Sequence, residues 1–156
     1  MKNKIFFIVV LYFLSCSESG NEKQTVKIEK DKFGVLISEI SYLNDTLKHG
    51  IAKYYFYNSK QISREKNYDR GKLNGVEKYY YENGNLFYSK TWKQNKLHGK
   101  VINFRENGSK RSEEIFNEGI RLSYVSYLEN GNKEFANYND LNGDIFVKRY
   151  MVRRAV

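Results

Sequence analysis

After position 33, short stretches of the chain alternate between apolar and polar residues, and glycine or asparagine separates one stretch from the next. A period of two is typical of β-strands, in which successive side chains point to opposite faces of a sheet. The alternation and the turn residues predict about ten strands of roughly six residues each, from a leading strand at residues 35–42 to a closing strand at 144–151. We therefore expect an all-β domain over residues 33–156.

The turn residues recur at a fixed interval. Glu-Asn-Gly occurs three times, about 24 residues apart, and a second series at the same period places glycine after Leu-Asn, Leu-His or Lys-His. Asn-Gly between apolar stretches strongly indicates a β-hairpin, because both central residues of a type I′ turn need positive φ. Each unit should contain two glycine turns, and the units should form an elongated, single-layer antiparallel meander of β-hairpins. The structural turn residues expected in the first series are Asn83, Gly84, Asn107, Gly108, Asn130 and Gly131.

The register of the clearest hairpin follows from placing Asn83-Gly84 at its turn. Counting outward gives the cross-strand pairs Tyr81–Leu86, Tyr79–Tyr88, Glu77–Lys90 and Gly75–Trp92, and in the next unit Phe116–Gly99. Aromatic and opposite-charge pairs across strands contribute roughly 0.2 to 1 kcal/mol each, so this register is favourable. The large aromatic residues that it collects on one face form the candidate binding surface, which comprises Tyr79, Tyr81, Tyr88 and Trp92.

The N-terminal residues follow a different pattern. Lys2 and Lys4 precede an unbroken apolar run at residues 5–14, which is short for a membrane-spanning helix and typical of a secretory signal peptide. The following stretch, Phe13-Leu14-Ser15-Cys16, resembles a bacterial lipobox, in which the cysteine is lipidated and becomes the first mature residue. We therefore expect a signal peptide at residues 1–15 and lipidation of Cys16, with an ordinary signal peptide or an uncleaved anchor as the alternatives.

Cys16 is the only cysteine, so its lipidation leaves no thiol for a disulfide, a zinc site or nucleophilic catalysis. Residues 16–32 are polar after Cys16 and lack aromatic side chains, which predicts a tether between the lipid and the folded domain. The expected location is the bacterial cell envelope. Because Ser17 and not Asp follows the cysteine, resemblance to sorted lipoproteins implies the outer membrane in bacteria that have two membranes.

Composition and charge limit the class of partner. The chain has 27 Lys and Arg against 18 Asp and Glu, a net charge of +9, and 14 Tyr, so a nucleic-acid-binding class must be considered. However, lysines on strands commonly keep a sheet solvated and its edges unpaired, and export separates the chain from most nucleic acid. No nucleic-acid partner is expected. The same basic and aromatic surface suits an envelope glycan or an anionic lipid as an alternative to a protein partner.

The sequence offers few candidates for catalysis. His49 and His98 are the only histidines, and they precede the recurring glycine in the column that holds Asn74 and Asn142 in other units. Asn and His both tolerate left-handed backbone geometry, so a role in turns is expected. Four strand spacings of about 4.8 Å place the two imidazoles about 19 Å apart, too far to share a zinc ion. We therefore expect a protein that is not an enzyme, with no catalytic residues, no metal site and no cofactor.

Two segments carry a family resemblance, KLNGVEKYYYENGNLFYSKTW and KLHGKVINFRENG. They resemble MORN repeats, in the variant of the YwqK-type antitoxin family, with a glycine, an aromatic pair, Asn-Gly and a second strand that ends in an aromatic residue. The resemblance covers residues 47–143 and implies a non-catalytic scaffold or interaction module. The antitoxin label implies a cytoplasmic toxin partner, whereas the signal peptide implies export. We therefore favour an envelope lipoprotein that presents its repeat surface to an unknown protein partner, and rank toxin neutralisation lowest.

Overall fold

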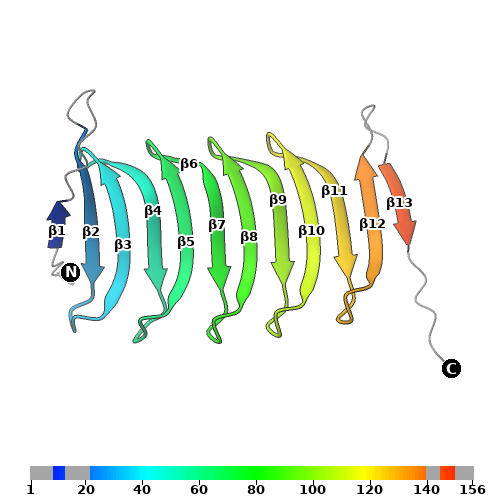
Figure 1. The fold of residues 1–156 in the computed structure, drawn as a ribbon, viewed down its shortest axis with the longest axis horizontal. Coiled ribbons are helices and arrows are strands. Elements are labelled where there is room, and N and C mark those ends of the chain that lie inside the picture. Colours follow the sequence, from blue (N-terminus) through cyan, green and yellow to red (C-terminus); the bar gives the residue numbers. More distant parts are fainter. Residues whose placement is uncertain (1–8, 13–21, 140–144, 150–156) are drawn as a thin grey trace, which may run out of the picture.

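The computed structural model describes residues 9–12, 22–139 and 145–149. They form a single antiparallel sheet, in which the strands follow one another in chain order (Figure 1). The strands are β1 (Val9–Tyr12), β2 (Gln24–Lys30), β3 (Leu36–Leu43), β4 (Leu47–Tyr55), β5 (Ile62–Asp69), β6 (Lys72–Leu73), β7 (Gly75–Tyr80), β8 (Leu86–Lys93), β9 (Lys96–Phe104), β10 (Lys110–Asn117), β11 (Ile120–Tyr127), β12 (Lys133–Asn139) and β13 (Ile145–Arg149).

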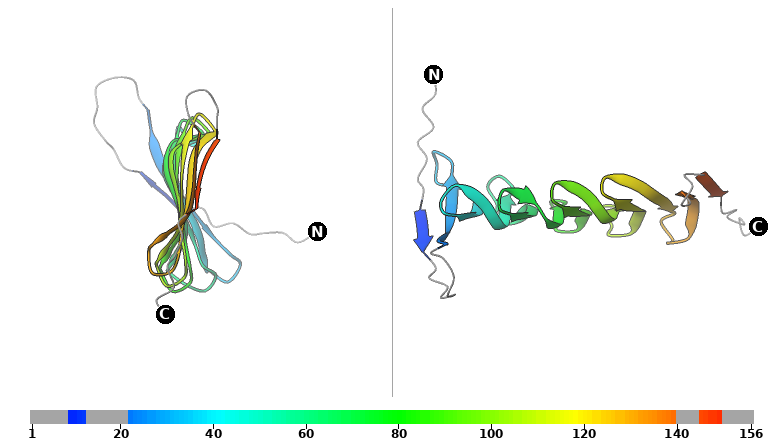
Figure 2. Two further views of the ribbon diagram at one scale, coloured as in Figure 1. Left: turned by 90° about the vertical axis from the view of Figure 1, so that its right-hand side faces the viewer. Right: turned by 90° about the horizontal axis from the view of Figure 1, so that it is seen from above.

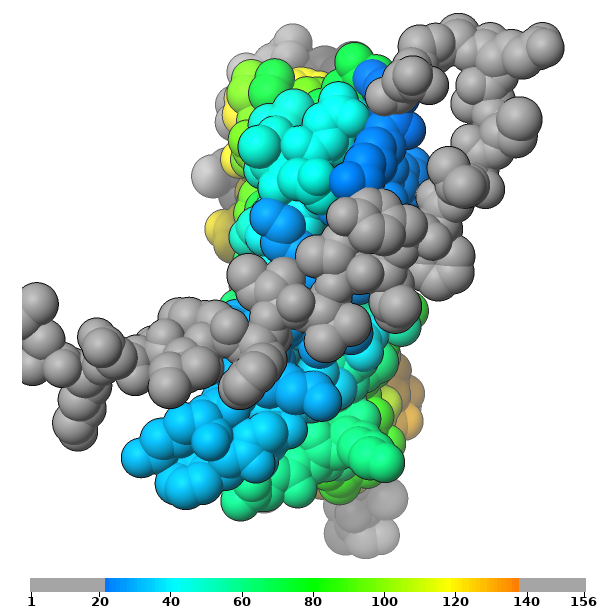
Figure 3. Space-filling model, turned by 90° about the vertical axis from the view of Figure 1, so that its left-hand side faces the viewer, coloured from blue at the N-terminus to red at the C-terminus, as the bar shows by residue number. Residues whose placement is uncertain are grey.

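The sheet is one layer thick and elongated across its strands, as the side and top views show (Figure 2). The sheet order is β1-β2-β3-β4-β5-β7-β8-β9-β10-β11-β12-β13, and the short β6 pairs with β5. An end-on view shows β2 and β3 in blue and cyan, with the later strands behind them (Figure 3). The predicted single-layer meander of hairpins is therefore confirmed, and the expected leading and closing strands correspond to β3 and β13. None of the described residues belongs to a helix long and apolar enough to cross a membrane.

The expected tether is wrong over residues 24–30, which form β2. This strand pairs with β3 along its whole length, and its Thr25 side chain is only 1% exposed. Val26 and Ile28 alternate with Lys27 and Glu29, which is itself a strand pattern, but the polar composition of the whole segment favoured a tether in the prediction. On its other side β2 pairs with β1, which lies within the expected signal peptide.

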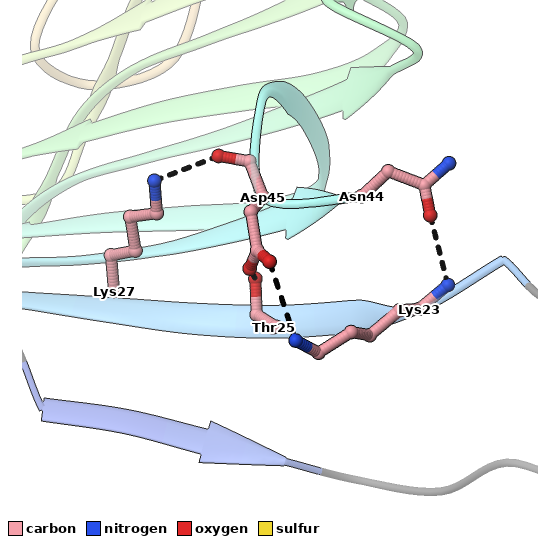
Figure 4. A network of polar contacts seen from close by, with 5 residues as sticks. All are labelled: Lys23, Thr25, Lys27, Asn44 and Asp45. Atoms are coloured by element: carbon pink, nitrogen blue, oxygen red, sulfur yellow. Dashed lines mark hydrogen bonds and ion pairs between the residues drawn. The ribbon is translucent and has the colours of Figure 1, made fainter.

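A polar network holds β2 against the turn between β3 and β4 (Figure 4). The Thr25 hydroxyl donates to Asp45 Oδ1 at 2.8 Å, and Lys23 Nζ lies 3.3 Å from Asp45 Oδ2. Lys27 Nζ donates to the Asp45 carbonyl at 2.7 Å, and the Lys23 N–H donates to Asn44 Oδ1 at 3.0 Å. The hydrogen bond from Thr25, followed by that from Lys23, lowers the pKa of Asp45. The network explains why a largely polar segment joins the sheet.

The Asn-Gly turns differ from the expected type I′ geometry. Only their glycines have positive φ, at 86° for Gly84, 83° for Gly108 and 82° for Gly131. Each turn asparagine instead accepts the N–H two residues later on its Oδ1, as Asn83 does from Asn85 at 2.9 Å. This is a three-residue loop, a type I turn followed by a glycine bulge. These residues lie in turns as predicted, but the turns are not of the predicted type I′.

The three-residue loop shifts the pairing next to the turn by one residue, and a second bulge, at Phe87, restores the expected pairing from Tyr79 onward. Tyr80 pairs with Leu86, so the expected pair Tyr81–Leu86 is wrong. Farther from the turn the expected register is confirmed, with the pairs Tyr79–Tyr88, Glu77–Lys90, Gly75–Trp92 and Phe116–Gly99. The register is robust there because one slip would exchange the two faces of the whole strand.

The second glycine series does not form turns. Gly50 lies in β4, Gly75 starts β7 and Gly99 lies in β9, all with positive φ, while Gly143 lies outside the described residues. The turns on this side have two consecutive residues of positive φ, which is the type I′ signature. They are Asn44-Asp45, Arg70-Gly71, Gln94-Asn95 and Glu118-Gly119.

These type I′ turns also connect neighbouring hairpins. In each, one turn N–H donates to a backbone carbonyl of the preceding unit, at 2.7 to 2.9 Å. The four bonds are Asn44 to Lys23, Gly71 to Lys48, Asn95 to Leu73 and Gly119 to Leu97. The repeat interval therefore reflects both the hairpin length and the contact between hairpins, as in other repeat proteins that are stabilised by their nearest neighbours.

Because the sheet has no second layer in the described residues, its core is small and partly polar. The buried apolar residues are Leu43, Ala52, Val101, Val125 and Ala136, and the buried polar residues are Thr25, Ser38, Glu77 and Ser112. Large side chains on the same face provide this burial. One such group surrounds Glu77 at the centre of the sheet.

Candidate functional site

One face of the central sheet carries a continuous group of aromatic and charged side chains from β4, β5, β7 and β8. The register aligns Tyr54 with Arg64, Arg64 with Tyr79, and Tyr79 with Tyr88 across the four strands. Alternation along the strands places the remaining members on the same face. We call this group the aromatic–cationic patch, and it comprises Lys48, Tyr54, Arg64, Lys66, Tyr68, Glu77, Tyr79, Tyr88, Lys90 and Trp92.

Aromatic rings form the side of the patch nearest the Asn83-Gly84 turn. Tyr79 and Tyr88 stack, with centroids 5.4 Å apart and planes at 20°. Phe87 contacts Tyr79, Tyr81 and Tyr88 at centroid distances of 6.0, 4.9 and 5.6 Å. The structure therefore brings three of the four predicted surface residues together. Strict alternation from Tyr88 would place Phe87 on the other face, so sequence reasoning missed it, and only the bulge beside the turn explains its position.

Trp92, the fourth predicted residue, joins the patch through Glu77. The indole N–H donates to Glu77 Oε2 at 2.9 Å, and Lys66 Nζ lies 3.3 Å from Glu77 Oε1. Glu77 is only 4% exposed, whereas Ala52 and Val101 are the buried residues at the corresponding positions of the neighbouring units. The sequence pairs Glu77 with Lys90, but its ion-pair partner is Lys66 on the adjacent strand. Glu77 thus fixes the positions of an indole and an ammonium group.

Three cations of the patch lie over tyrosine rings. Arg64 Cζ is 4.3 Å from the Tyr54 centroid, Lys90 Nζ is 4.2 Å from that of Tyr88, and Lys48 Nζ is 5.3 Å from that of Tyr68. Such cation–π contacts contribute about 0.5 to 2 kcal/mol, depending on solvent exposure. Among the described residues, none of the three makes an ion pair with a carboxylate.

Two tyrosines of the patch, Tyr68 and Tyr88, have raised pKa values. Burial raises the pKa of Tyr68, and the nearby Tyr54 hydroxyl adds to this effect. Burial also raises the pKa of Tyr88, where the Glu77 carboxylate acts in the same direction. Each hydroxyl is also hydrogen-bonded inside the patch, Tyr68 with Tyr54 and Tyr88 with Glu77, and these bonds hold the two rings in place.

On the opposite face, lysines and glutamates lie side by side across the strands. In the register, Lys53 lies between Glu39 and Glu65, and Lys78 lies beside Glu65. Tyr80 donates its hydroxyl to Glu65 Oε2 at 3.0 Å, and Tyr55 bonds Glu39 in the same way. Among the described residues, neither Lys53 nor Lys78 makes an ion pair with these glutamates.

Tyr55 and Tyr80 are expected to resist ionisation at high pH. Burial, with the hydrogen bond to a glutamate, raises the pKa of each to about 12. Because this exceeds the ordinary value near 10, their contribution to stability is complete below about pH 10 and is lost as the pH rises through about 12. An ultraviolet titration of tyrosinate should show a late step that shrinks in Tyr80→Phe. One step near the ordinary tyrosine value in the folded wild type would contradict these hydrogen bonds.

The two histidines lie in strands and not in the expected turns. In β4, His49 Nδ1 accepts the Arg70 N–H at 3.3 Å and lies 3.4 Å from Asp69 Oδ1. In β9, His98 Nδ1 lies 3.6 Å from Glu118 Oε1. The order β4-β5-β7-β8-β9 separates the two strands by four steps, as expected. Within the part of the chain that the structure describes, no group of three or more His, Cys, Asp or Glu side chains could hold a metal ion.

In comparisons with known proteins, no family model and no curated protein matches the chain. The resemblance to MORN repeats therefore rests on the sequence segments alone. Cys16 lies outside the described residues, so its lipidation stays a prediction.

Proposed function

We propose that the chain is a non-catalytic binding protein of the bacterial cell envelope and that its aromatic–cationic patch contacts a partner protein. The observation that carries the proposal is the concentration of half-buried Tyr, Trp and Arg side chains on one face of a single-layer sheet. These three residue types are the ones enriched at the energetic centres of protein interfaces. No second layer of the described residues packs on this face, so the patch is presented to solvent.

The rigidity of the patch supports the same function. Tyr79 is held by stacking on Tyr88, and Trp92 by its hydrogen bond to Glu77. Side chains that are already ordered lose less conformational freedom on binding, so they give more affinity for the same contact. The two histidines lie in β4 and β9, four strand steps apart, so they cannot act together at one site.

Truncation of single tyrosines in the aromatic–cationic patch is expected to weaken binding of the partner without unfolding the sheet. Tyr79→Ser and Tyr88→Ser should each weaken capture of the partner about tenfold or more, as truncation at an interface centre does. The partner would first be identified from solubilised envelopes and then titrated in pure form, with circular dichroism to verify the sheet. Tyr55→Ser on the opposite face and the double variant His49→Asn with His98→Asn serve as controls.

The possible outcomes of this experiment distinguish the proposed function from its alternatives. Folded Tyr79→Ser and Tyr88→Ser proteins that bind like the wild type would exclude this face. Loss of activity in the folded histidine variant would favour an enzyme. Patch-dependent binding to purified peptidoglycan or lipopolysaccharide, in place of a protein, would favour the glycan or lipid alternative, and a toxin as the captured partner would favour neutralisation.

The proposed location in the cell envelope depends on lipidation of Cys16. After lipidation and cleavage, residues 1–15 would leave together with β1, and β2 would become the first strand of the sheet. Cys16→Ser should therefore either release the protein from the membrane fraction or leave it unprocessed. Fractionation and intact mass measure these effects. A mature wild-type protein without acyl mass on Cys16 would contradict lipid anchoring, including anchoring at an outer membrane.

A further inference from the structure

The aromatic–cationic patch carries more positive charge than its own carboxylate compensates. It contains Lys48, Arg64, Lys66 and Lys90, but only one acid, Glu77, which is occupied by Lys66 and by the indole of Trp92. Other groups of cations in the described residues have a carboxylate at their centre. Glu113 lies within 3.3 Å of both Lys100 and Lys110, and Glu118 lies near Lys93 and Lys96. The central acid of the patch, Glu77, pairs with Lys66 alone, and Lys48, Arg64 and Lys90 make no ion pair among the described residues.

Arg64 is the member best placed to receive an anion. Its Nε is buried and has no hydrogen-bond partner, although the guanidinium plane lies on the Tyr54 ring. A buried donor without a partner is costly, and a guanidinium fork matches a carboxylate in a bidentate pair. Because Nε is buried, a partner's carboxylate could reach only the two terminal nitrogens of the guanidinium, and contact with a ring leaves their N–H groups available to donate.

Lys90 supplies a second cation at a defined spacing from Arg64. The Arg64 guanidinium lies over Tyr54 of β4 and the Lys90 ammonium over Tyr88 of β8, so about three strand spacings, roughly 14 Å, separate the two charged groups. In an extended segment, residues four positions apart are separated by about 13 Å, at roughly 3.3 Å per residue, and their side chains point to the same face. An extended chain that crosses the strands could therefore place one carboxylate on each cation, above the stacked rings of Tyr79 and Tyr88.

We infer that the patch binds an acidic, extended segment of its protein partner, with one carboxylate on Arg64 and a second carboxylate, four residues away, on Lys90. This inference rests on the proposed function, in which the patch contacts a protein. The partner segment would pair with the terminal nitrogens of Arg64 and neutralise the charge that Glu77 leaves uncompensated.

A labelled peptide tests the inference without knowledge of the natural partner. The probe is a threonine-rich peptide with two glutamates four positions apart, and its control has glutamine at both positions. Fluorescence anisotropy with the full-length protein should give saturable binding of the acidic probe, about tenfold tighter than that of the glutamine control. A probe with its glutamates at adjacent positions should bind more weakly than the first, because one carboxylate then misses Lys90.

Matched variants separate a built site from general attraction to a basic protein. Arg64→Gln and Lys90→Gln should each weaken the acidic probe about tenfold, and Arg64→Lys should give an intermediate loss because it keeps the charge but not the fork. Lys53→Gln and Lys78→Gln remove the same charge from the opposite face and should leave binding within twofold. Circular dichroism establishes folding, and Lys90→Gln still tests the inference if Arg64→Gln unfolds.

Several results would overturn the inference. Equal weakening by the variants on both faces would show non-specific attraction. Patch-dependent binding to phosphatidylglycerol vesicles or to a polyuronate, without binding to the acidic peptide, would assign the patch to a lipid or a glycan. If Tyr79→Ser no longer binds the natural partner but both Arg64→Gln and Lys90→Gln still bind it, the proposed function stands and the acidic-segment inference fails. If Tyr79→Ser and Tyr88→Ser retain the partner, the proposed function itself fails.

Discussion

Gly75→Ala is expected to lower the free energy of unfolding by about 2 to 4 kcal/mol, through backbone strain and a steric clash. Gly75 begins β7 with φ at 103°, a region that side chains other than glycine rarely adopt. A Cβ added there would lie 3.2 Å from Asn67 Cβ, an atom that cannot move without the β5 backbone. The substitution thus strains the chain at the centre of the patch, opposite Trp92.

Gly119→Ala is the matched control, because it also has positive φ, at 90°, but a Cβ there would meet nothing within 4 Å. It should cost only the backbone strain, about 1 to 2 kcal/mol. Chemical denaturation of the two variants with the wild type measures the difference. Equal losses at both positions would show that the close approach of β7 to β5 is unimportant and would contradict the described packing.

Glu77→Ala is expected to lower the free energy of unfolding by about 3 kcal/mol. The substitution removes a buried carboxylate, so one partner loses its opposite charge and another loses its hydrogen-bond acceptor. Lys66 Nζ would lose its carboxylate, and the Trp92 N–H would lose its acceptor. The indole should also become more mobile, which time-resolved tryptophan fluorescence can measure at the single tryptophan of the chain.

Glu77→Val with Lys66→Met should recover most of this loss, because buried ion pairs can often be replaced by apolar residues at little cost. Valine is also the residue that the next unit uses at this position, where Val101 is buried. Glu118→Ala removes a solvent-exposed carboxylate and should have little effect. If the double variant is as unstable as Glu77→Ala, the acid stabilises the sheet by a route other than its pair with Lys66.

Residues close in sequence explain why the hairpins and their pairing could be predicted. The pairs Tyr79–Tyr88 and Gly75–Trp92 are joined by one short loop, so the turn residues and the alternation of side chains suffice to align them. The candidate surface was largely predictable for the same reason, since its tyrosines share one hairpin.

The wrong predictions occur where a short stretch of sequence is compatible with two backbone geometries. Asn-Gly suits both a two-residue type I′ turn and a three-residue loop with a glycine bulge, so the turn residues alone did not separate them. A second bulge leaves Phe87 without a cross-strand partner beside Tyr79, and nothing in the turn residues indicates it. The second glycine series suggested turns by its repeat, although the predicted pairs Gly75–Trp92 and Phe116–Gly99 place Gly75 and Gly99 in strands.

By itself, the repeated sequence determined that this chain forms a meander of hairpins, because strand period, turn residues and repeat length are all local properties. Only the tertiary structure decided what lies beside each hairpin. The attachment of β2 through Asp45, the pairing of Glu77 with Lys66, and the alignment of Arg64 with Tyr79 depend on side chains from different loops or hairpins. Such contacts depend on the stacking between units and the bulges within them, and these set which side chains of neighbouring strands meet on one face.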